Sequence, residues 1–281
     1  MRRFADKVSV ITGAGSGIGR ALSVELARRG ARLALSDVDL VTVAETAALC
    51  EKEGADVRHY QLDVADRAAV YAHAEAVVGE FGAANLVINN AGVALMASVS
   101  EMSWEDLEWV MNIDYWGVIH GTKAFLPHLI ASGDGHVVNI SSVFGLIGVP
   151  TQSAYNSAKF AVRGFTEALR QEMLIERRRV GVSCVHPGGI RTNIVRNART
   201  SDGGTTTSDM HRRFQQLTLT TPDRAAKIIL RGVERNRPRI LVGPDAYVID
   251  ALPRVLGPLY QRITATGVRL ASRFGIDLGP Y

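Results

Sequence analysis

The chain has 281 residues, of which 47% are hydrophobic and 21% charged, with 27 glycines, 9 prolines and a net charge of +4. A chain of this length buries roughly 75% of its unfolded surface, so it is expected to form one well-buried globular domain or two small ones. The composition excludes a disordered protein, a collagen-like repeat and a small disulfide-stapled protein.

The chain opens with a β-branched run, Val8 to Thr12, which predicts a strand that leads into glycines. Ile18, Leu22 and Leu26 follow at four-residue spacing and place one apolar stripe on a helix that Gly30 closes. The first predicted unit is therefore a strand, a glycine-rich turn and a helix.

The same alternation continues along the chain. Further strands are expected at Arg32 to Ser36, Val57 to Leu62, Leu86 to Asn89, Val137 to Ile140 and Val180 to Val185. Further helices are expected from Leu40 towards Gly54, from Val70 to Phe81, from Ser103 onward and from Ser153 to Arg178. Strands that alternate with helices indicate βαβ units with right-handed crossovers. We expect a single-domain, Rossmann-like α/β fold, a doubly wound parallel sheet with helices on both faces.

Two later segments do not continue the alternation. Thr200 to Ser208 is rich in Thr, Ser and Gly and predicts either a mobile lid or a loose surface turn. Ala246 to Phe274 mixes apolar residues with arginines, and Pro253, Gly257 and Pro258 break it into short amphipathic helices. This tail is expected to cover a substrate cleft, to pack on a neighbouring subunit or to lie on a membrane surface.

The spacing of the two cysteines and the first residues of the chain indicate where the protein is located. Cys50 and Cys184 lie far apart without Cys-x-x-Cys spacing, so neither a disulfide framework nor a zinc ribbon is expected, and a reducing compartment fits. Arg2 and Arg3 resemble the start of a signal peptide, but Asp6 interrupts them before an apolar run develops. No run of about 18 apolar residues occurs. We expect a cytoplasmic protein without a transmembrane segment.

The basic residues are unevenly distributed. Residues 191–281 hold 15 Lys and Arg against 7 Asp and Glu, whereas residues 1–190 hold 17 against 21. Nucleic acid, an anionic substrate tail or a membrane surface would each explain such an excess. Because no nucleic-acid-binding motif accompanies the charge, we expect an arginine-rich solvated face and no nucleic-acid partner.

The glycine-rich turn, Thr12 to Gly19, lies between the first strand and the first helix. A phosphate there meets the positive end of the helix dipole and unpaired N–H groups. The spacing fits neither G-x-G-x-x-G nor the triphosphate loop, which requires a lysine. Taken alone the turn is a weak signal, because any tight strand-to-helix turn favours glycine.

Asp37 strengthens the prediction of a dinucleotide site. It ends the second strand about 20 residues after the glycines, where a carboxylate binds the adenine ribose hydroxyls. A 2′-phosphate would meet a like charge, and neither Ser16 nor Val38 is basic. We therefore predict NAD rather than NADP, with the alternative that Asp37 only caps the following helix.

With these residues in view, the chain resembles the short-chain dehydrogenase/reductase family, in its shorter branch. The motifs that carry the resemblance are Thr-Gly-x-x-x-Gly-x-Gly at 12–19, Asn89-Asn90-Ala91-Gly92, Tyr155-Asn156-Ser157-Ala158-Lys159, and Pro187-Gly188 with Thr192 beyond it. Their order and spacing match over roughly residues 5–245. The sequence after Thr192 and the tail depart from any motif that identifies a substrate.

The resemblance implies roles for single residues. Tyr155 would be the general acid/base, Lys159 its electrostatic partner and ribose ligand, Ser142 the donor that holds the substrate oxygen, and Asn112 the anchor of a proton-relay water. Ser141 is the alternative to Ser142. The implied cofactor contacts are Gly13, Ser16, Gly17, Ile18, Gly19, Asp37, Asp63, Val64, Asn90, Ala91, Gly92, Tyr155, Lys159, Pro187, Gly188, Ile190 and Thr192. Among them, Asp63 and Val64 would contact adenine, and Ile190 and Thr192 the nicotinamide carboxamide.

Tyr155 and Lys159 suit this chemistry on physical grounds as well. Four residues apart on one helix, they rise on the same face. A free tyrosine has a pKa of about 10, and an ammonium at roughly 4 Å favours its ionised form by up to about 4 kcal/mol. Burial has the opposite effect, so we expect that Lys159 needs the positive nicotinamide ring as well.

We predict an NAD-dependent oxidoreductase that interconverts a secondary alcohol and a ketone, without a metal. The alternatives are an NADP-dependent ketoreductase and a non-catalytic cofactor-sensing protein. Residues 1–245 would form the NAD-binding catalytic domain and residues 246–281 its helical extension. A homo-oligomer, a tetramer or a dimer, is implied by the resemblance alone.

Overall fold

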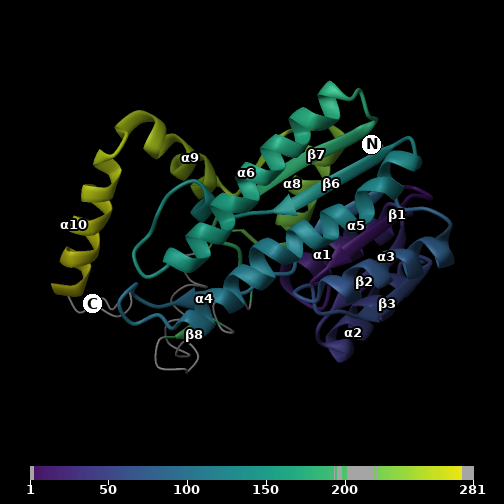
Figure 1. The fold of residues 1–281 in the computed structure, drawn as a ribbon, viewed down its shortest axis with the longest axis horizontal. Helices are drawn as coiled ribbons and strands as arrows, with labels where there is room; N and C mark the ends of the chain where they lie inside the picture. The colour runs from purple at the N-terminus through teal and green to yellow at the C-terminus, as the bar shows by residue number, and fades with distance from the viewer. Residues whose placement is uncertain (1–2, 193, 195–197, 201–217, 219, 274–281) are drawn as a thin grey trace.

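The computed structural model describes residues 3–192, 194, 198–200, 218 and 220–273. Its centre is a sheet of seven parallel strands in the order β3-β2-β1-β4-β6-β7-β9 (Figure 1). The strands are β1 (Val8–Thr12), β2 (Arg32–Asp37), β3 (Val57–Gln61), β4 (Leu86–Asn89), β6 (Gly135–Ile140), β7 (Val180–Pro187) and β9 (Arg239–Val242). Two short strands pair apart from this sheet, β5 (Leu95–Met96) and β8 (Arg199–Thr200).

The strand order shows that the chain winds in two directions. It runs outward from β1 through β2 to β3, returns to β4 on the other side of β1, and then continues through β6 and β7 to β9. Open α/β sheets place their ligands where the order reverses, outside the carboxyl ends of the strands. The expected doubly wound parallel sheet is confirmed, and its switch point lies between β1 and β4.

Helices cover both faces of the sheet. They are α1 (Gly17–Arg28), α2 (Leu40–Lys52), α3 (Arg67–Phe81), α4 (Trp104–Met111), α5 (Gly117–Ala131), α6 (Ser153–Ile175), α8 (Pro222–Glu234), α9 (Pro244–Leu256) and α10 (Leu259–Arg273). Helices α1, α2 and α8 share one hydrophobic core with the sheet, and α3, α5 and α6 share the other. A π-helical turn, Asn112–Trp116, joins α4 to α5.

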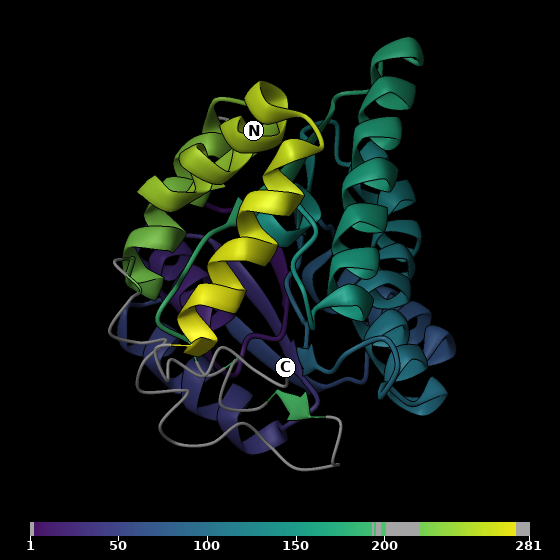
Figure 2. The same cartoon turned by 90° about the vertical axis from the view of Figure 1, so that its left-hand side faces the viewer.

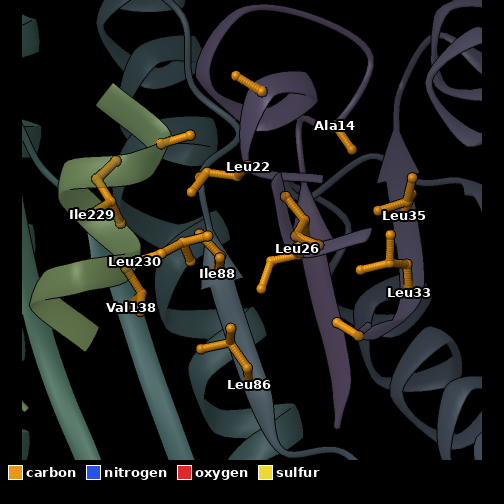
Figure 3. Packing of buried hydrophobic residues seen from close by; sticks show 14 of the residues in the cluster. Ala14, Leu22, Leu26, Leu33, Leu35, Leu86, Ile88, Val138, Ile229 and Leu230 are labelled. Atoms are coloured by element: carbon orange, nitrogen blue, oxygen red, sulfur yellow. The ribbon is translucent and has the colours of Figure 1, made fainter. Parts of the chain in front are cut away.

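Alternation along the strands produces the two cores. Leu33 and Leu35 of β2 belong to the core under α1, whereas Ala34 between them belongs to the opposite one. Figure 3 shows Leu22 and Leu26 of α1 directed into the first core, with side chains from the sheet and from α8. Full burial of each such leucine stabilises the fold by roughly 1.5–3 kcal/mol.

Two expected elements differ in detail, and two further elements were not expected. The helix expected from Ser103 begins at Trp104, where the Ser103 hydroxyl accepts a hydrogen bond from Asp106 N–H at 3.0 Å, and it is interrupted by the π-helical turn. Helix α6 ends at Ile175, before the expected Arg178. Helix α8 and strand β9 were not predicted. Strand β9 has only four residues and follows an arginine-rich stretch, so it carries little periodicity.

Up to Arg273, where the described part of the tail ends, the tail forms helices, as expected, and breaks at one place. Gly257, with φ of 53°, separates α9 from α10, whereas Pro253 lies inside the last turn of α9. Helix α10 stands apart from the layers (Figure 1) and crosses the face seen in Figure 2. The Tyr260 hydroxyl accepts a hydrogen bond from Gly148 N–H at 3.1 Å. Within the described ranges, no helix is long and apolar enough to cross a membrane. The segment expected as a lid or turn lies outside the described residues after Thr200.

Candidate active site

The loops that follow β1, β4, β6 and β7 meet at the carboxyl edge of the sheet, and Asn90 joins the first two. Its side-chain amide donates to the carbonyls of Thr12 at 2.9 Å and Gly13 at 3.1 Å. The Thr12 hydroxyl accepts hydrogen bonds from the N–H groups of Asn90 and Ala91. A Cβ on Gly13 would lie 2.7 Å from Ala91 Cα. Asn90 therefore holds the glycine-rich turn against the end of β4, a role the sequence reasoning missed.

The N-terminus of α1 is open to an anion. Ser16 precedes the helix without capping it through its side chain, and no acidic residue lies in the first turn, Gly17, Ile18 and Gly19. The neighbouring helices α2 and α3, by contrast, are capped by Asp39 and Asp66. The N–H groups at the start of α1 are therefore not occupied by a side-chain cap or by an acidic residue of the first turn, and together with the helix dipole they suit an anion.

Asp37 lies beside this turn at the end of β2. Its Oδ2 accepts a hydrogen bond from Gly15 N–H at 2.8 Å, and its Oδ1 accepts one from Asp39 N–H at 3.1 Å. The cap of α2 is Asp39, whose carboxylate accepts from the N–H groups of Val41 and Thr42. The alternative that Asp37 only caps α2 is therefore wrong.

The two residues expected near adenine follow β3. Asp63 is exposed, and its carboxylate accepts a hydrogen bond from Ala65 N–H at 2.9 Å. Val64 is buried, and its carbonyl accepts from the His120 ring at 3.0 Å. Both residues lie at the same edge of the sheet as Asp37, since β3 and β2 are parallel neighbours.

The segment after β7 closes the opposite side of the site. Pro187 ends β7, and Gly189 N–H donates to Asp245 Oδ2 of α9 at 2.6 Å. A Cβ on Gly188 would overlap the Asp245 carboxylate, so glycine is required there. Asp245, distant in sequence, is a second residue that the sequence reasoning missed.

Two residues further along this segment extend it toward the glycine-rich turn. Ile190 pairs with Thr220 in an isolated bridge. Thr192 faces the turn, where its Cγ2 would lie 3.2 Å from a Cβ on Gly17. The segment from β7 therefore meets the start of α1 across the site.

Tyr155 and Lys159 lie on the first turns of α6. Lys159 Nζ is 5.4 Å from the centroid of the Tyr155 ring, and the Ser142 side chain lies close enough to the phenol to lower its pKa. The Ser141 hydroxyl instead donates to the Lys159 carbonyl at 2.8 Å. The two neighbouring serines thus differ: Ser142 faces the phenol, and Ser141 attaches β6 to α6.

A carboxylate that the sequence reasoning missed completes this cluster. Asp114 Oδ2 lies 3.0 Å from Lys159 Nζ, and the two side chains are 0% and 4% exposed. Asp114 Oδ1 accepts a hydrogen bond from Val93 N–H at 2.7 Å. A Cβ on Gly92 would lie 3.3 Å from Asp114 and 3.4 Å from Lys159 Nζ, so the Gly92 backbone packs against the ion pair.

Asn112 is not brought to this cluster. It is exposed, and it lines a surface cavity together with Tyr71 and Trp116. Two residues along a helical turn point in different directions, so Asn112 and Asp114 face opposite ways. Asp114, and not Asn112, therefore lies beside Lys159, and the role of Asn112 as the anchor of a proton-relay water stays a prediction.

The electrostatics of the cluster follow from burial and pairing. Burial raises the pKa of Tyr155 above its ordinary value. The positive charge of Lys159 lowers this pKa, and the negative charge of Asp114 raises it further. Burial also raises the pKa of Asp114, against the effect of Lys159 and of the Val93 N–H group. Burial alone would lower the pKa of Lys159, but the Asp114 charge raises it above its ordinary value. The phenol is therefore protonated and the lysine charged in the protein alone.

Comparison with known proteins identifies the family. The model of the short chain dehydrogenase family matches residues 7–203. The chain belongs to this family of oxidoreductases. The putative oxidoreductase SadH of Mycobacterium tuberculosis is 55% identical over 268 residues, which cover 95% of this chain and 97% of SadH. Estradiol 17-beta-dehydrogenase 11 of Mus musculus is 31% identical over 263 residues, 93% of this chain and 84% of that protein.

A solved structure agrees. The crystal structure of a short chain dehydrogenase/reductase from Burkholderia phymatum in complex with NAD has a TM-score of 0.84 at 30% identity, covering 92% of this chain and 97% of that one. The fold expected for a short-chain dehydrogenase/reductase is thereby confirmed.

Two further residues support the site in this short-chain dehydrogenase. Asn156, beside Tyr155, donates to the carbonyls of Phe144 at 2.7 Å and Ile147 at 2.9 Å. It thereby fixes the loop that carries Ser142. The His186 ring donates through Nδ1 to the Ser142 carbonyl at 2.9 Å, and burial lowers the pKa of His186 to about 4, so this ring is neutral.

Proposed function

We propose that this short-chain dehydrogenase is an NAD-dependent enzyme that interconverts a secondary alcohol and a ketone, with Tyr155 as general acid/base. The observation that carries the proposal is the convergence of three groups at one point. The phenol of Tyr155, the hydroxyl of Ser142 and the ammonium of Lys159 lie together at the carboxyl edge of the sheet. The open N-terminus of α1 lies at the same edge.

The residues of the chain act on one oxygen atom. The Ser142 hydroxyl and the Tyr155 phenol both hydrogen-bond the alcohol oxygen, which orients the carbinol hydrogen. In the oxidative direction the ionised form of Tyr155 would accept the hydroxyl proton, and in the reductive direction the protonated phenol would donate that proton to the ketone oxygen. NAD supplies the hydride acceptor when bound. Lys159 stabilises the ionised phenol, which burial otherwise disfavours.

The preference for NAD rests on Asp37. Its carboxylate would accept hydrogen bonds from the adenine ribose and repel a 2′-phosphate. Arg20 would not relieve this repulsion, since its guanidinium already contacts Glu45 at 2.9 Å and Thr46 at 2.9 Å. The relative from Burkholderia phymatum carries NAD.

The remaining contacts and partners are proposed on the same basis. The start of α1 would hold the cofactor pyrophosphate, Asp63 and Val64 the adenine, and Ile190 and Thr192 the carboxamide. The substrate would be a medium-sized, mostly apolar secondary alcohol, a class that fits the relative named estradiol 17-beta-dehydrogenase 11. The division at residue 245 and assembly into a dimer or tetramer stay predictions.

The test combines a cofactor comparison with one substitution. Reduction of NAD and of NADP is measured against a panel of steroids, diols and aliphatic secondary alcohols. We expect turnover with NAD, and Tyr155→Phe is expected to lower kcat by several orders of magnitude at nearly unchanged NAD affinity. Tyr71→Phe, at an exposed position on α3, is the matched control. Preference for NADP would refute the role of Asp37, and full activity of Tyr155→Phe would refute the mechanism.

A further inference from the structure

The ion pair between Asp114 and Lys159 is unusually enclosed. Neither side chain is more than 4% exposed, and their charged atoms are 3.0 Å apart. A buried carboxylate is retained in a protein core only when it is paired and hydrogen-bonded. Both conditions hold here, since Asp114 also accepts the hydrogen bond from Val93 N–H.

The surroundings of Asp114 specify a carboxylate rather than an amide. Its two oxygens each face a donor, Oδ1 the Val93 N–H group and Oδ2 the Lys159 ammonium. An asparagine offers one acceptor oxygen and one NH₂ donor. An asparagine at position 114 would therefore direct its NH₂ group against one of the two donors. An aspartate instead offers an oxygen to each donor and a negative charge to the Lys159 ammonium.

We propose that Asp114 is a positioning residue that holds the ammonium of Lys159 and, by pairing its charge, keeps the Tyr155 phenol protonated in the free protein. Lys159 is the cation that would otherwise favour the phenolate. Its nitrogen contacts Asp114 at 3.0 Å and the Ile140 carbonyl at 3.4 Å. The consequence for catalysis rests on the proposed function, whereas the effect on the phenol does not.

The groups that act on the phenol come from three elements, and a fourth element acts on Lys159. Lys159 lies on α6, Asp114 on the π-helical turn, and Ser142 after β6. Cys184 of β7 acts on Lys159, but its thiol is neutral because burial raises the pKa of Cys184 to about 12. Asp114 is thus the negative charge that opposes Lys159 at the phenol.

The size of the effect follows from distance. A unit charge 5.4 Å from the Tyr155 ring, in an effective dielectric of about 20, moves a pKa by roughly two. Asp114 cancels part of this effect. Its removal is expected to lower the ionisation midpoint of Tyr155 by about one pH unit or more.

The experiment titrates the phenol directly. The near-ultraviolet absorbance of tyrosinate is followed against pH in wild-type protein, Asp114→Asn and Asp114→Glu, each with its own Tyr155→Phe variant as the blank. We expect a lower midpoint in Asp114→Asn, and a midpoint within about half a pH unit of wild type in Asp114→Glu, which keeps the charge. The pH profile of alcohol oxidation should move to lower pH in Asp114→Asn in the same way.

Each outcome decides the proposal. An unchanged midpoint in folded Asp114→Asn would overturn it. If Asp114→Asn does not fold, the wild-type protein and Asp114→Glu decide: a Tyr155 phenolate at neutral pH in the free protein contradicts the proposal, and a protonated phenol with an unchanged midpoint in Asp114→Glu supports it. Absence of turnover with every alcohol, together with a lowered midpoint, would refute the proposed function and leave the role of Asp114 standing.

Discussion

Replacing Lys159 by Met should destabilise the protein strongly, whatever its substrate. The substitution leaves the Asp114 carboxylate, 0% exposed, without its cation. Removing one partner of a buried ion pair costs about 3–5 kcal/mol. At 3.0 Å and an effective dielectric of about 20, the attraction lost is of the same order. We therefore expect the free energy of unfolding to fall by about 3–5 kcal/mol and Tm by about 6–20 °C.

The loss should depend on pH in a defined direction. Without Lys159, burial holds the pKa of Asp114 above its unfolded value of about 3.9. A group whose pKa is raised on folding contributes stability at low pH and loses it as pH rises through the folded pKa. The deficit of Lys159→Met relative to wild type should therefore be smallest near pH 4 and grow toward neutral pH.

Urea unfolding followed by tryptophan fluorescence measures this prediction. Lys123→Met on α5, at an exposed position, is the control and should change stability by less than about 0.5 kcal/mol. The double variant Lys159→Met with Asp114→Asn should recover about 2 kcal/mol of the loss, because no buried charge then remains. If Lys159→Met lowers the free energy of unfolding by less than about 1 kcal/mol, or by an amount that does not depend on pH, the stabilising role of the Asp114–Lys159 ion pair is refuted.

Two further predictions concern the serines after β6 and the buried histidines. Ser141→Ala should cost about 1 kcal/mol of stability, because it removes the hydrogen bond to the Lys159 carbonyl. Ser142→Ala should instead lower kcat more than stability, and equal effects in chemical unfolding and steady-state kinetics would contradict this distinction. The free energy of unfolding should fall as pH drops from about 6.5 to about 4, since burial lowers the pKa of His73 and His186 to about 4 and the unfolded chain takes up protons first. Urea unfolding at a series of pH values tests it, and a flat profile over this interval would exclude the neutral, buried state of these rings.

Most strands and helices could be predicted from the sequence, because each depends on the pattern of neighbouring residues along the chain. Short β-branched runs such as Val8–Thr12 form strands buried on both faces, and the four-residue spacing of Leu22 and Leu26 directs both side chains into one core. Strand β9 was not foreseen, since four residues after an arginine-rich stretch carry little periodicity. Its place at the sheet edge depends on pairing with β7, a contact between segments distant in sequence.

The glycine-rich turn illustrates a second limit. The sequence indicates where the turn lies, and its glycines are expected for a phosphate. In the structure, Gly13 and Gly19 are also required by close packing, with Asn90 bound across them. The two glycines therefore have a packing role as well as the expected role in the candidate site. The packing role becomes visible only when their contacts in the structure are known.

By itself the sequence determined the layers of the sheet and the shared face of Tyr155 and Lys159, because spacing along one helix fixes which side chains rise together. It did not determine which residue of the 112–116 turn meets Lys159. That choice depends on the π-helical turn and on Gly117, where a Cβ would lie 2.7 Å from Val64 Cγ2. These contacts orient the turn so that Asp114 points inward and Asn112 outward, a result of packing between elements that no periodicity along the chain encodes.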